Sequence, residues 1–355
     1  MNASETSTRV PISPESTQMF VEAGQVARVV EQQLHSNAAP LVALAERLRR
    51  IEPRIIFTCA RGSSDHAATF AKYLFETHLG IPTLSQAPSI SSIYDGALLH
   101  MDGQPFILVS QSGRSPDLLA SAEGARKGGA LVIALVNDTA SPLADLAEVV
   151  VPLHAGRETS VAATKSFIAS LTAFAHLAHS WRPDTALGTA IGRLPEMLAD
   201  AWEADWSPAL DMLADAQSLY LLGRGLTLGI AQEAALKCKE TCGIHGEAFS
   251  IAEVAHGPMA LVGPDFPLLV FPPLDEASAG LDAVLATVAG RGAPVALAGK
   301  ARPGTIGLPV MADLHPVTGP IVMAQSFYRL VNALAVRRGY DPDNPPLLRK
   351  VTETR

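Results

Sequence analysis

The segment from Ser110 to Asp117 concentrates groups that can hold an anion. It reads Ser-Gln-Ser-Gly-Arg-Ser-Pro-Asp and follows an apolar segment, and Pro116 stands where proline favours the first position of a helix. Backbone N–H groups at a helix start and serine hydroxyls together make a good phosphate site. Ordinary helix capping accounts for one serine but not for Ser110, Ser112 and Ser115 together, so we expect this turn to bind phosphate.

The loop over residues 62–65, Gly-Ser-Ser-Asp, has a similar character and also follows an apolar segment. Ligands of open parallel sheets bind beyond the carboxyl ends of the strands, which is where both loops are expected. The second half of the chain lacks matching serines and has Leu-Val-Phe-Pro-Pro at residues 269–273 instead. Phosphate binding is therefore expected of the first half alone.

Acid and base chemistry is expected from the second half. Glu233, Lys237 and Glu240 fall at i, i+4 and i+7, which places them on one face of a helix. A solvated stripe of ion pairs is the ordinary explanation, but the neighbouring residues are small and apolar and indicate a partly buried helix. A carboxylate there is expected to have a raised pKa and to transfer protons near neutral pH.

Two histidines and two glutamates follow this helix in a glycine-punctuated stretch. They are His245, Glu247, Glu253 and His256. The spacing of the two histidines matches no common zinc pattern, so we expect no metal. General acid or base chemistry stays open for this stretch, and so does a structural role, which is common for a histidine beside Gly-Pro.

Strands that alternate with helices are needed to position these groups. Short, almost wholly apolar segments bounded by Gly and Pro are expected strands of a parallel sheet covered on both faces. The expected strands cover residues 55–60, 81–86, 106–110, 131–136, 148–152, 218–222, 267–271, 294–298 and 308–311. The expected helices cover residues 64–78, 116–127, 161–180, 227–241, 278–290 and 320–338, with helical patterns also over 19–48 and 184–216.

The order of these elements repeats along the chain. Arg61-Gly62 aligns with Arg224-Gly225 at an offset of 163 residues, and further apolar segments align at nearly the same offset. The repeat predicts two similar domains that share a cleft. We expect a tail and helix over residues 1–40, a first domain over 41–195, a second domain over 196–340 and a C-terminal tail over 341–355.

Composition limits the classes of partner. The 355 residues carry a formal net charge of -8 and no long basic run, which argues against nucleic acid. The three cysteines without zinc-ligand spacing indicate reduced thiols. No apolar run approaches the roughly 20 residues of a membrane span, and the polar N-terminus does not read as a signal peptide. We expect a cytoplasmic protein with no membrane or nucleic-acid partner.

Five ordered motifs together resemble the isomerase half of glutamine–fructose-6-phosphate amidotransferase, which belongs to the sugar isomerase (SIS) family. They are residues 110–113 (Ser-Gln-Ser-Gly), 161–167 (Val-Ala-Ala-Thr-Lys-Ser-Phe), 235–240 (Ala-Leu-Lys-Cys-Lys-Glu), 255–258 (Ala-His-Gly-Pro) and 348–352 (Leu-Arg-Lys-Val-Thr). The resemblance covers roughly residues 20–352. It implies an α/β fold with two tandem SIS domains, each a doubly wound, five-stranded parallel sheet flanked by helices. It also implies a homodimer that uses no cofactor.

The resemblance further implies a role for each matched residue. Glu240 would move the proton between C1 and C2, beside Lys237, which would hold substrate oxygens. His256 would assist ring opening in the neighbouring subunit, and Lys350, in a tail over the active site, would form a Schiff base with the ketose. The sugar phosphate would be bound by Gly62, Ser63, Ser64, Ser110, Gln111, Ser112 and Ser115, and by the backbone of Val161 and Ala162.

Three departures from the family pattern bear on the identity of the sugar. Arg61, Ala163 and Arg114 stand where the family has a cysteine, a serine and an acidic residue. The family's glutaminase domain is not found in this sequence, so we expect conversion of glucosamine 6-phosphate and water to fructose 6-phosphate and ammonia. The alternatives are a galactosamine or fructosamine 6-phosphate as substrate, an aminotransferase-like isomerase subunit, or a non-catalytic sugar-phosphate sensor.

Overall fold

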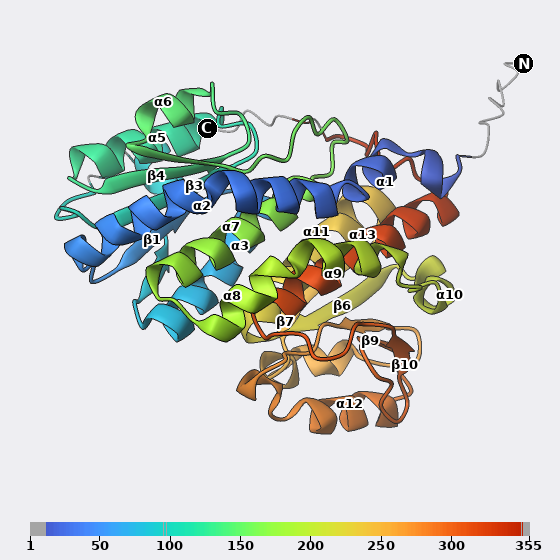
Figure 1. The fold of residues 1–355 in the computed structure, drawn as a ribbon. Helices are drawn as coiled ribbons and strands as arrows, with labels where there is room; N and C mark the ends of the chain where they lie inside the picture. Colours follow the sequence, from blue (N-terminus) through green and yellow to red (C-terminus); the bar gives the residue numbers. More distant parts are fainter. Residues whose placement is uncertain (1–11, 95, 97, 349, 351–355) are drawn as a thin grey trace, which may run out of the picture.

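The chain forms two parallel five-stranded sheets with helices packed around and between them (Figure 1). The computed structural model describes residues 12–94, 96, 98–348 and 350. The first sheet has the strand order β2-β1-β3-β4-β5, and the second, read from the corresponding edge, has the order β7-β6-β8-β9-β10. The expected α/β architecture of two tandem five-stranded sheets is confirmed.

The strands are short and consist mostly of apolar residues. Those of the first sheet are β1 (Ile56–Cys59), β2 (Thr83–Ser85), β3 (Pro105–Ser110), β4 (Leu131–Val136) and β5 (Val149–Pro152). Those of the second sheet are β6 (Ser218–Gly223), β7 (His245–Ser250), β8 (Leu268–Val270), β9 (Val295–Ala298) and β10 (Ile306–Leu308). Strand β7 differs from the sequence prediction, which placed no strand there, because it is a polar edge strand.

Helices connect the strands and extend beyond the sheets. In the first half they are α1 (Gln18–Ala23), α2 (Val26–Ile51), α3 (Ser63–Leu74), α4 (Ser89–Ser92), α5 (Pro116–Lys127), α6 (Pro142–Leu146) and α7 (Lys165–Trp181). The others are α8 (Thr185–Gly192), α9 (Leu194–Glu203), α10 (Pro208–Ala214), α11 (Leu228–Cys242), α12 (Leu281–Gly290) and α13 (Thr318–Arg337). The domain boundaries expected at residues 40 and 195 fall inside α2 and α9, and they stay predictions.

Each sheet is covered on both faces. In β3, Ile107 and Val109 pack into a large core that both halves share, whereas Phe106 and Leu108 pack beneath α5 and α6. This alternation follows from the two-residue period of a strand and explains why β3 is buried along its whole length.

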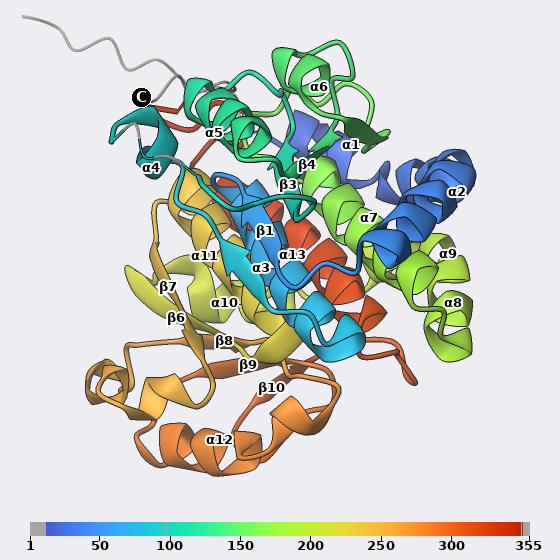
Figure 2. The same ribbon diagram turned by 90° about the vertical axis from the view of Figure 1, so that its left-hand side faces the viewer.

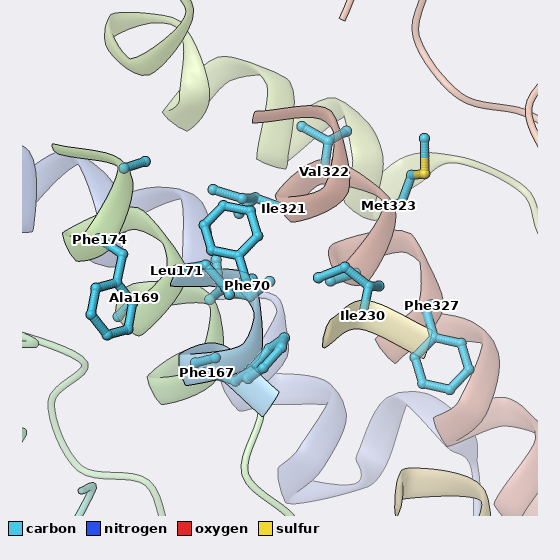
Figure 3. Packing of buried hydrophobic residues seen from close by; sticks show 14 of the residues in the cluster. Phe70, Phe167, Ala169, Leu171, Phe174, Ile230, Ile321, Val322, Met323 and Phe327 are labelled. Atoms are coloured by element: carbon cyan, nitrogen blue, oxygen red, sulfur yellow. The ribbon is translucent and has the colours of Figure 1, made fainter. Parts of the chain in front are cut away.

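A layer of helices between the two sheets joins the halves of the molecule. Helices α3, α7, α11 and α13 form this layer (Figure 2). Their buried side chains gather in one core, with Phe70 from α3, Phe167 from α7, Ile230 from α11 and Phe327 from α13 (Figure 3). Because α11 packs against α3, charged groups on the second-half helix are placed beside the polar loop that opens α3.

Two general expectations concern cysteines and membranes. All three cysteines are buried and form no disulfide, and burial raises the pKa of Cys59 to about 12. Within the described ranges, none of the helices is long and apolar enough to cross a bilayer.

Candidate active site

A cavity of about 500 Å³ lies beyond the carboxyl ends of β1 and β3. Ligands bind in this position in open parallel sheets, and the volume is typical of a site for a small molecule. The residues that line it are Arg61, Gly62, Ser64, Val109, Ser110, Gln111, Ser112, Ser115, Leu118 and Lys350. The structure thus brings together most of the residues predicted to hold a phosphate, and it adds Arg61 to them.

The turn from Ser110 to Ser115, named the serine turn below, is held in shape by a glycine. Gly113 has a φ of 62°, and a Cβ atom added there would lie 2.1 Å from Ser141 Oγ, so only glycine fits. The Gly113 N–H donates to Ser110 Oγ at 2.9 Å. Ser115 is the N-cap residue of α5, as expected, but its hydroxyl accepts no capping bond. Its side chain is therefore available to a ligand in the cavity.

The polar loop at the start of α3 connects the cavity to the second half. Gly62 and Ser64 line the cavity, and Gly62 is the N-cap of α3 with a φ of 55°. Between them, Ser63 Oγ donates to Glu233 Oε1 at 3.1 Å and accepts from Lys237 Nζ at 3.2 Å. One short loop thus contacts the cavity with two residues and α11 with the third.

Glu233, Lys237 and Glu240 lie together as predicted, and we name them the charged face of α11. Lys237 Nζ lies 3.3 Å from Glu233 Oε1 and 2.6 Å from Glu240 Oε2. The Glu233 and Lys237 side chains are each 1% exposed, and that of Glu240 is 20% exposed. The three residues are therefore no solvated stripe, and Glu240 is the most exposed of them.

Neighbouring charged and polar groups shift the pKa values of Glu233 and Lys237 on the charged face. Burial acts to raise the pKa of Glu233, but the Lys237 ammonium, the His66 ring and the Ser63 hydroxyl outweigh it and hold that pKa below its ordinary value. Burial likewise acts to lower the pKa of Lys237, but Glu233 and Glu240 raise it above its ordinary value. The expected raised carboxylate pKa is thus wrong for Glu233, and Lys237 remains a cation that can neutralise a charged substrate oxygen.

Lys350 enters the cavity wall from the C-terminal tail. Its Nζ donates to the Ser160 carbonyl at 2.7 Å and lies 3.4 Å from Glu158 Oε2. Glu158 is buried and also accepts from the N–H groups of Thr164 and Ser166, at the start of α7. The sequence reasoning missed Glu158, because no spacing or composition separates it from an ordinary loop carboxylate.

Helix α1 braces both the tail and the loop before α7. Asp343 of the tail accepts from the N–H groups of Gln18 and Met19 at 2.6 and 2.7 Å. Near the other end of α1, Glu22 accepts from the Thr159 N–H at 2.6 Å. Helix α1 thus contacts both the tail that carries Lys350 and the loop that carries its partners, Glu158 and Ser160.

Several predicted residues lie away from the cavity wall. Val161 and Ala162 precede α7 in the same loop as Ser160, but neither lines the cavity. His256 follows the short helical turn Glu253–Ala255 and is exposed, and its side chain makes no hydrogen bond to any described residue. A role for His256 in a neighbouring subunit stays a prediction.

The other candidates of that stretch do not form a metal site. His245 begins β7 and is exposed, and Glu247 is exposed on the same strand. Across the described part of the chain, no group of three or more His, Cys, Asp or Glu side chains could hold a metal ion. Of the tail motif, residues 349, 351 and 352 lie outside the described residues.

The arrangement combines two kinds of chemistry. The serine turn offers hydroxyls and the N-terminus of α5 to an anion, with Arg61 and Lys350 as cations in the same wall. Behind the α3 loop lie a carboxylate and a buried ammonium in direct contact. Such a set can hold a phosphate, stabilise an enediolate and move a proton between adjacent carbons.

A family model and a curated relative both match long stretches of the chain. The model of the SIS domain matches residues 51–180 and again residues 212–302. A glutamine–fructose-6-phosphate aminotransferase [isomerizing] from Thermococcus kodakarensis is 31% identical over 349 residues, which cover 94% of this chain and 57% of that protein. The chain thus spans little more than half the length of this curated relative.

Solved structures are similar over nearly the whole chain. A Silicibacter pomeroyi DSS-3 protein, provisionally assigned as a phosphosugar isomerase, is 41% identical with a TM-score of 0.87, covering 92% of this chain and 100% of that one. The C-terminal domain of glucosamine-fructose-6-phosphate aminotransferase from Francisella tularensis is 26% identical with a TM-score of 0.82, covering 97% and 100%. Two SIS matches over more than half of the sequence, together with these relatives, show that the chain belongs to the SIS family.

Proposed function

We propose that the protein is a phosphosugar isomerase that converts glucosamine 6-phosphate and water to fructose 6-phosphate and ammonia. The observation that carries this proposal is the contact between the two halves through Ser63. This residue lies between two cavity-lining residues and is hydrogen-bonded to Lys237, which in turn pairs with Glu240. A substrate whose phosphate occupies the serine turn can therefore direct its other end towards the charged face of α11.

Binding begins with the phosphate. The Ser112 and Ser115 hydroxyls and the N-terminus of α5 hold its oxygens, which leaves the sugar carbons free to extend along the α3 loop. After the ring opens, the substrate is a 2-amino aldehyde. We assign assistance of ring opening to His256 of a second copy in a homodimer, by likeness to the family.

Proton transfer then converts the aldehyde to a ketimine. Glu240 takes the proton from C2 while the aldehyde oxygen gains negative character, which the Lys237 ammonium stabilises before that oxygen is protonated. Glu240 returns the proton to C1, and the amino nitrogen releases one proton, which balances the proton gained by the oxygen. C1 is then an alcohol and C2 an imine. Water adds to C2 and ammonia leaves, so one water is consumed for each ammonia released. Lys350 can hold the ketose at the same carbon as a Schiff base.

An ammonia-release assay tests the proposal. The purified protein is incubated with the 6-phosphates of glucosamine and galactosamine and with a fructosamine 6-phosphate, and ammonia and fructose 6-phosphate are measured together. We expect equal amounts of both products from glucosamine 6-phosphate. Release from only one of the other two compounds would redirect the proposal to that substrate, and release from none would contradict an amino-sugar enzyme.

A further inference from the structure

Arg61 places a guanidinium in a cavity wall where the family pattern has a thiol. Among the described residues that line the cavity, Arg61 and Lys350 are the cations. Lys350 is already occupied by the Ser160 carbonyl and the buried Glu158. The Arg61 side chain is 51% exposed and has one carboxylate partner within the described ranges, Asp117, whose side chain is fully buried.

The contact with Asp117 uses only one edge of the guanidinium. Arg61 Nε and Nη2 lie 2.7 and 2.6 Å from the same oxygen, Asp117 Oδ2. The other oxygen of this carboxylate accepts from the Leu118 N–H at 2.8 Å, inside the first turn of α5. Arg61 Nη1 forms no hydrogen bond within the described part of the chain, so its edge remains for a ligand. Asp117 in turn is fully buried in the helix that follows the serine turn, which restricts its movement.

We propose that Arg61 binds the phosphate of the substrate through this remaining edge, with Asp117 as the residue that orients it. This inference rests on the proposed function for the identity of the phosphate carrier. Two parallel N–H groups of a guanidinium match two phosphate oxygens, which a lysine cannot reproduce. Because a buried carboxylate already fixes the side chain, little rotamer freedom is lost when the ligand binds.

Arg114 is a nearby arginine that is not placed to bind the phosphate. It lies in the serine turn itself and also replaces a residue of the family pattern, but it does not line the cavity. Its Nη2 lies 2.8 Å from Asp138 Oδ2, and both side chains are substantially exposed, at 50% and 38%. Of the two arginines, Arg61 therefore determines affinity for the anion, and Arg114 serves as its matched control.

Binding of inorganic phosphate, followed by isothermal titration calorimetry, tests the inference without requiring turnover. Arg61→Gln is expected to weaken phosphate binding roughly tenfold to a hundredfold, because a hydrogen-bonded charge pair is lost. Arg61→Lys should fall between this variant and the unaltered protein. Arg114→Gln should bind within about twofold of the unaltered protein, since surface ion pairs of this kind contribute little.

A second variant guards against misfolding. Arg61→Gln leaves Asp117 buried without a cation, so Arg61→Gln combined with Asp117→Asn removes both charges and should lose phosphate affinity to the same degree. Equal phosphate binding by the unaltered protein and the double variant would overturn the inference, as would the absence of phosphate binding by the unaltered protein.

Kinetics separate this inference from the proposed function. With glucosamine 6-phosphate, Arg61→Gln should raise KM by the same tenfold to hundredfold and change kcat by less than about threefold, because the contact is made equally in the ground and transition states. If the unaltered protein releases no ammonia while phosphate binding still depends on Arg61, the proposed function fails and the inference stands. If ammonia is released and KM is unchanged in Arg61→Gln, the proposed function stands and the inference fails.

Discussion

Helices α3 and α11 hold the same place in the two halves, after the first strand of each sheet, but their inner faces differ in chemistry. At the offset of 163 residues, Glu233 and Lys237 correspond to Phe70 and Leu74. All four side chains are buried. The first-half pair contributes to the apolar core, whereas the second-half pair forms ion pairs, so one architecture accommodates either packing or acid–base chemistry at one position.

The segments after β3 and β8 also differ, but here the first half carries the polar groups and the second half the apolar ones. In the first half, β3 leads through the serine turn directly into α5. In the second half, β8 is followed by the buried Phe271 and two prolines, and α12 begins only at Leu281. We therefore expect each half to contribute a different part of the proposed site, with Ser63 between the two parts. If the site is divided in this way, matched changes in the two halves should have different effects.

The largest effect is expected from Glu240. Glu240→Gln removes proton transfer but retains a hydrogen-bonding group beside Lys237, so kcat for ammonia release should fall by roughly 10²–10⁴-fold. Affinity for glucosamine 6-phosphate should change little. Glu247→Gln, an exposed glutamate on β7, is the control and should leave kcat unaltered. A kcat within threefold of the unaltered protein would remove Glu240 from the mechanism.

Lys237 lies where the two halves meet, and its loss is expected to lower the free energy of unfolding substantially. Lys237→Met leaves Glu233 buried without its main cation, which should lower the free energy of unfolding by about 3–5 kcal/mol in a denaturant titration. Glu233→Gln combined with Lys237→Met removes both charges and should recover part of the loss. At the first-half counterpart, Leu74→Met conserves volume and should cost less than about 1.5 kcal/mol. Equal losses in Lys237→Met and Leu74→Met would show that the pair matters only as packing.

A smaller effect separates the two segments that follow β3 and β8. Ser115→Ala should raise KM for the sugar phosphate roughly tenfold, because one hydrogen bond to a charged group is lost. Ser278→Ala, at the matching offset in the second half, should leave KM unchanged, since Ser278 Oγ donates to the Asp275 carbonyl and lies outside the cavity. Similar KM values in both variants would refute a phosphate site confined to the first half.

The smallest effect is a pH dependence of stability. The pKa of Glu233 in the folded protein lies below the ordinary value of 4.5, so its contribution is present above pH 4.5 and is lost as the pH falls towards the folded-state pKa. The free energy of unfolding should therefore fall more steeply below pH 4.5 in the unaltered protein than in Glu233→Gln. Parallel curves for the two proteins would show that Glu233 is not held as a stabilised carboxylate.

Sequence patterns predicted the parts of the fold that are buried and continuous. Strands β3 and β4 are apolar along their length because both faces are covered, and this makes them recognisable. Strand β7 was missed because an edge strand pairs with one neighbour, β6, and carries exposed residues such as His245 and Glu247. The pairing of its backbone with β6, and not a pattern of apolar side chains, makes β7 a strand.

The candidate site was predictable where residues close in sequence share a function. The serine turn and the charged face of α11 both follow from local spacing. The partners of Lys350 and Arg61 could not be predicted from local spacing. Packing between segments far apart in the chain brings Glu158 to Lys350 and Asp117 to Arg61. Burial acts to raise the pKa of Glu233, as expected, but the Lys237 ammonium beside it reverses the direction of the shift.

A crystal structure of Glu240→Gln with glucosamine 6-phosphate tests the central claim, which is that one substrate spans both halves. We expect the phosphate within hydrogen-bonding distance of Ser112, Ser115 and Arg61, and C1 and C2 beside the amide at position 240 and the Lys237 ammonium. A phosphate bound in the serine turn with the sugar carbons directed away from α11, or a ligand bound elsewhere, would contradict the account.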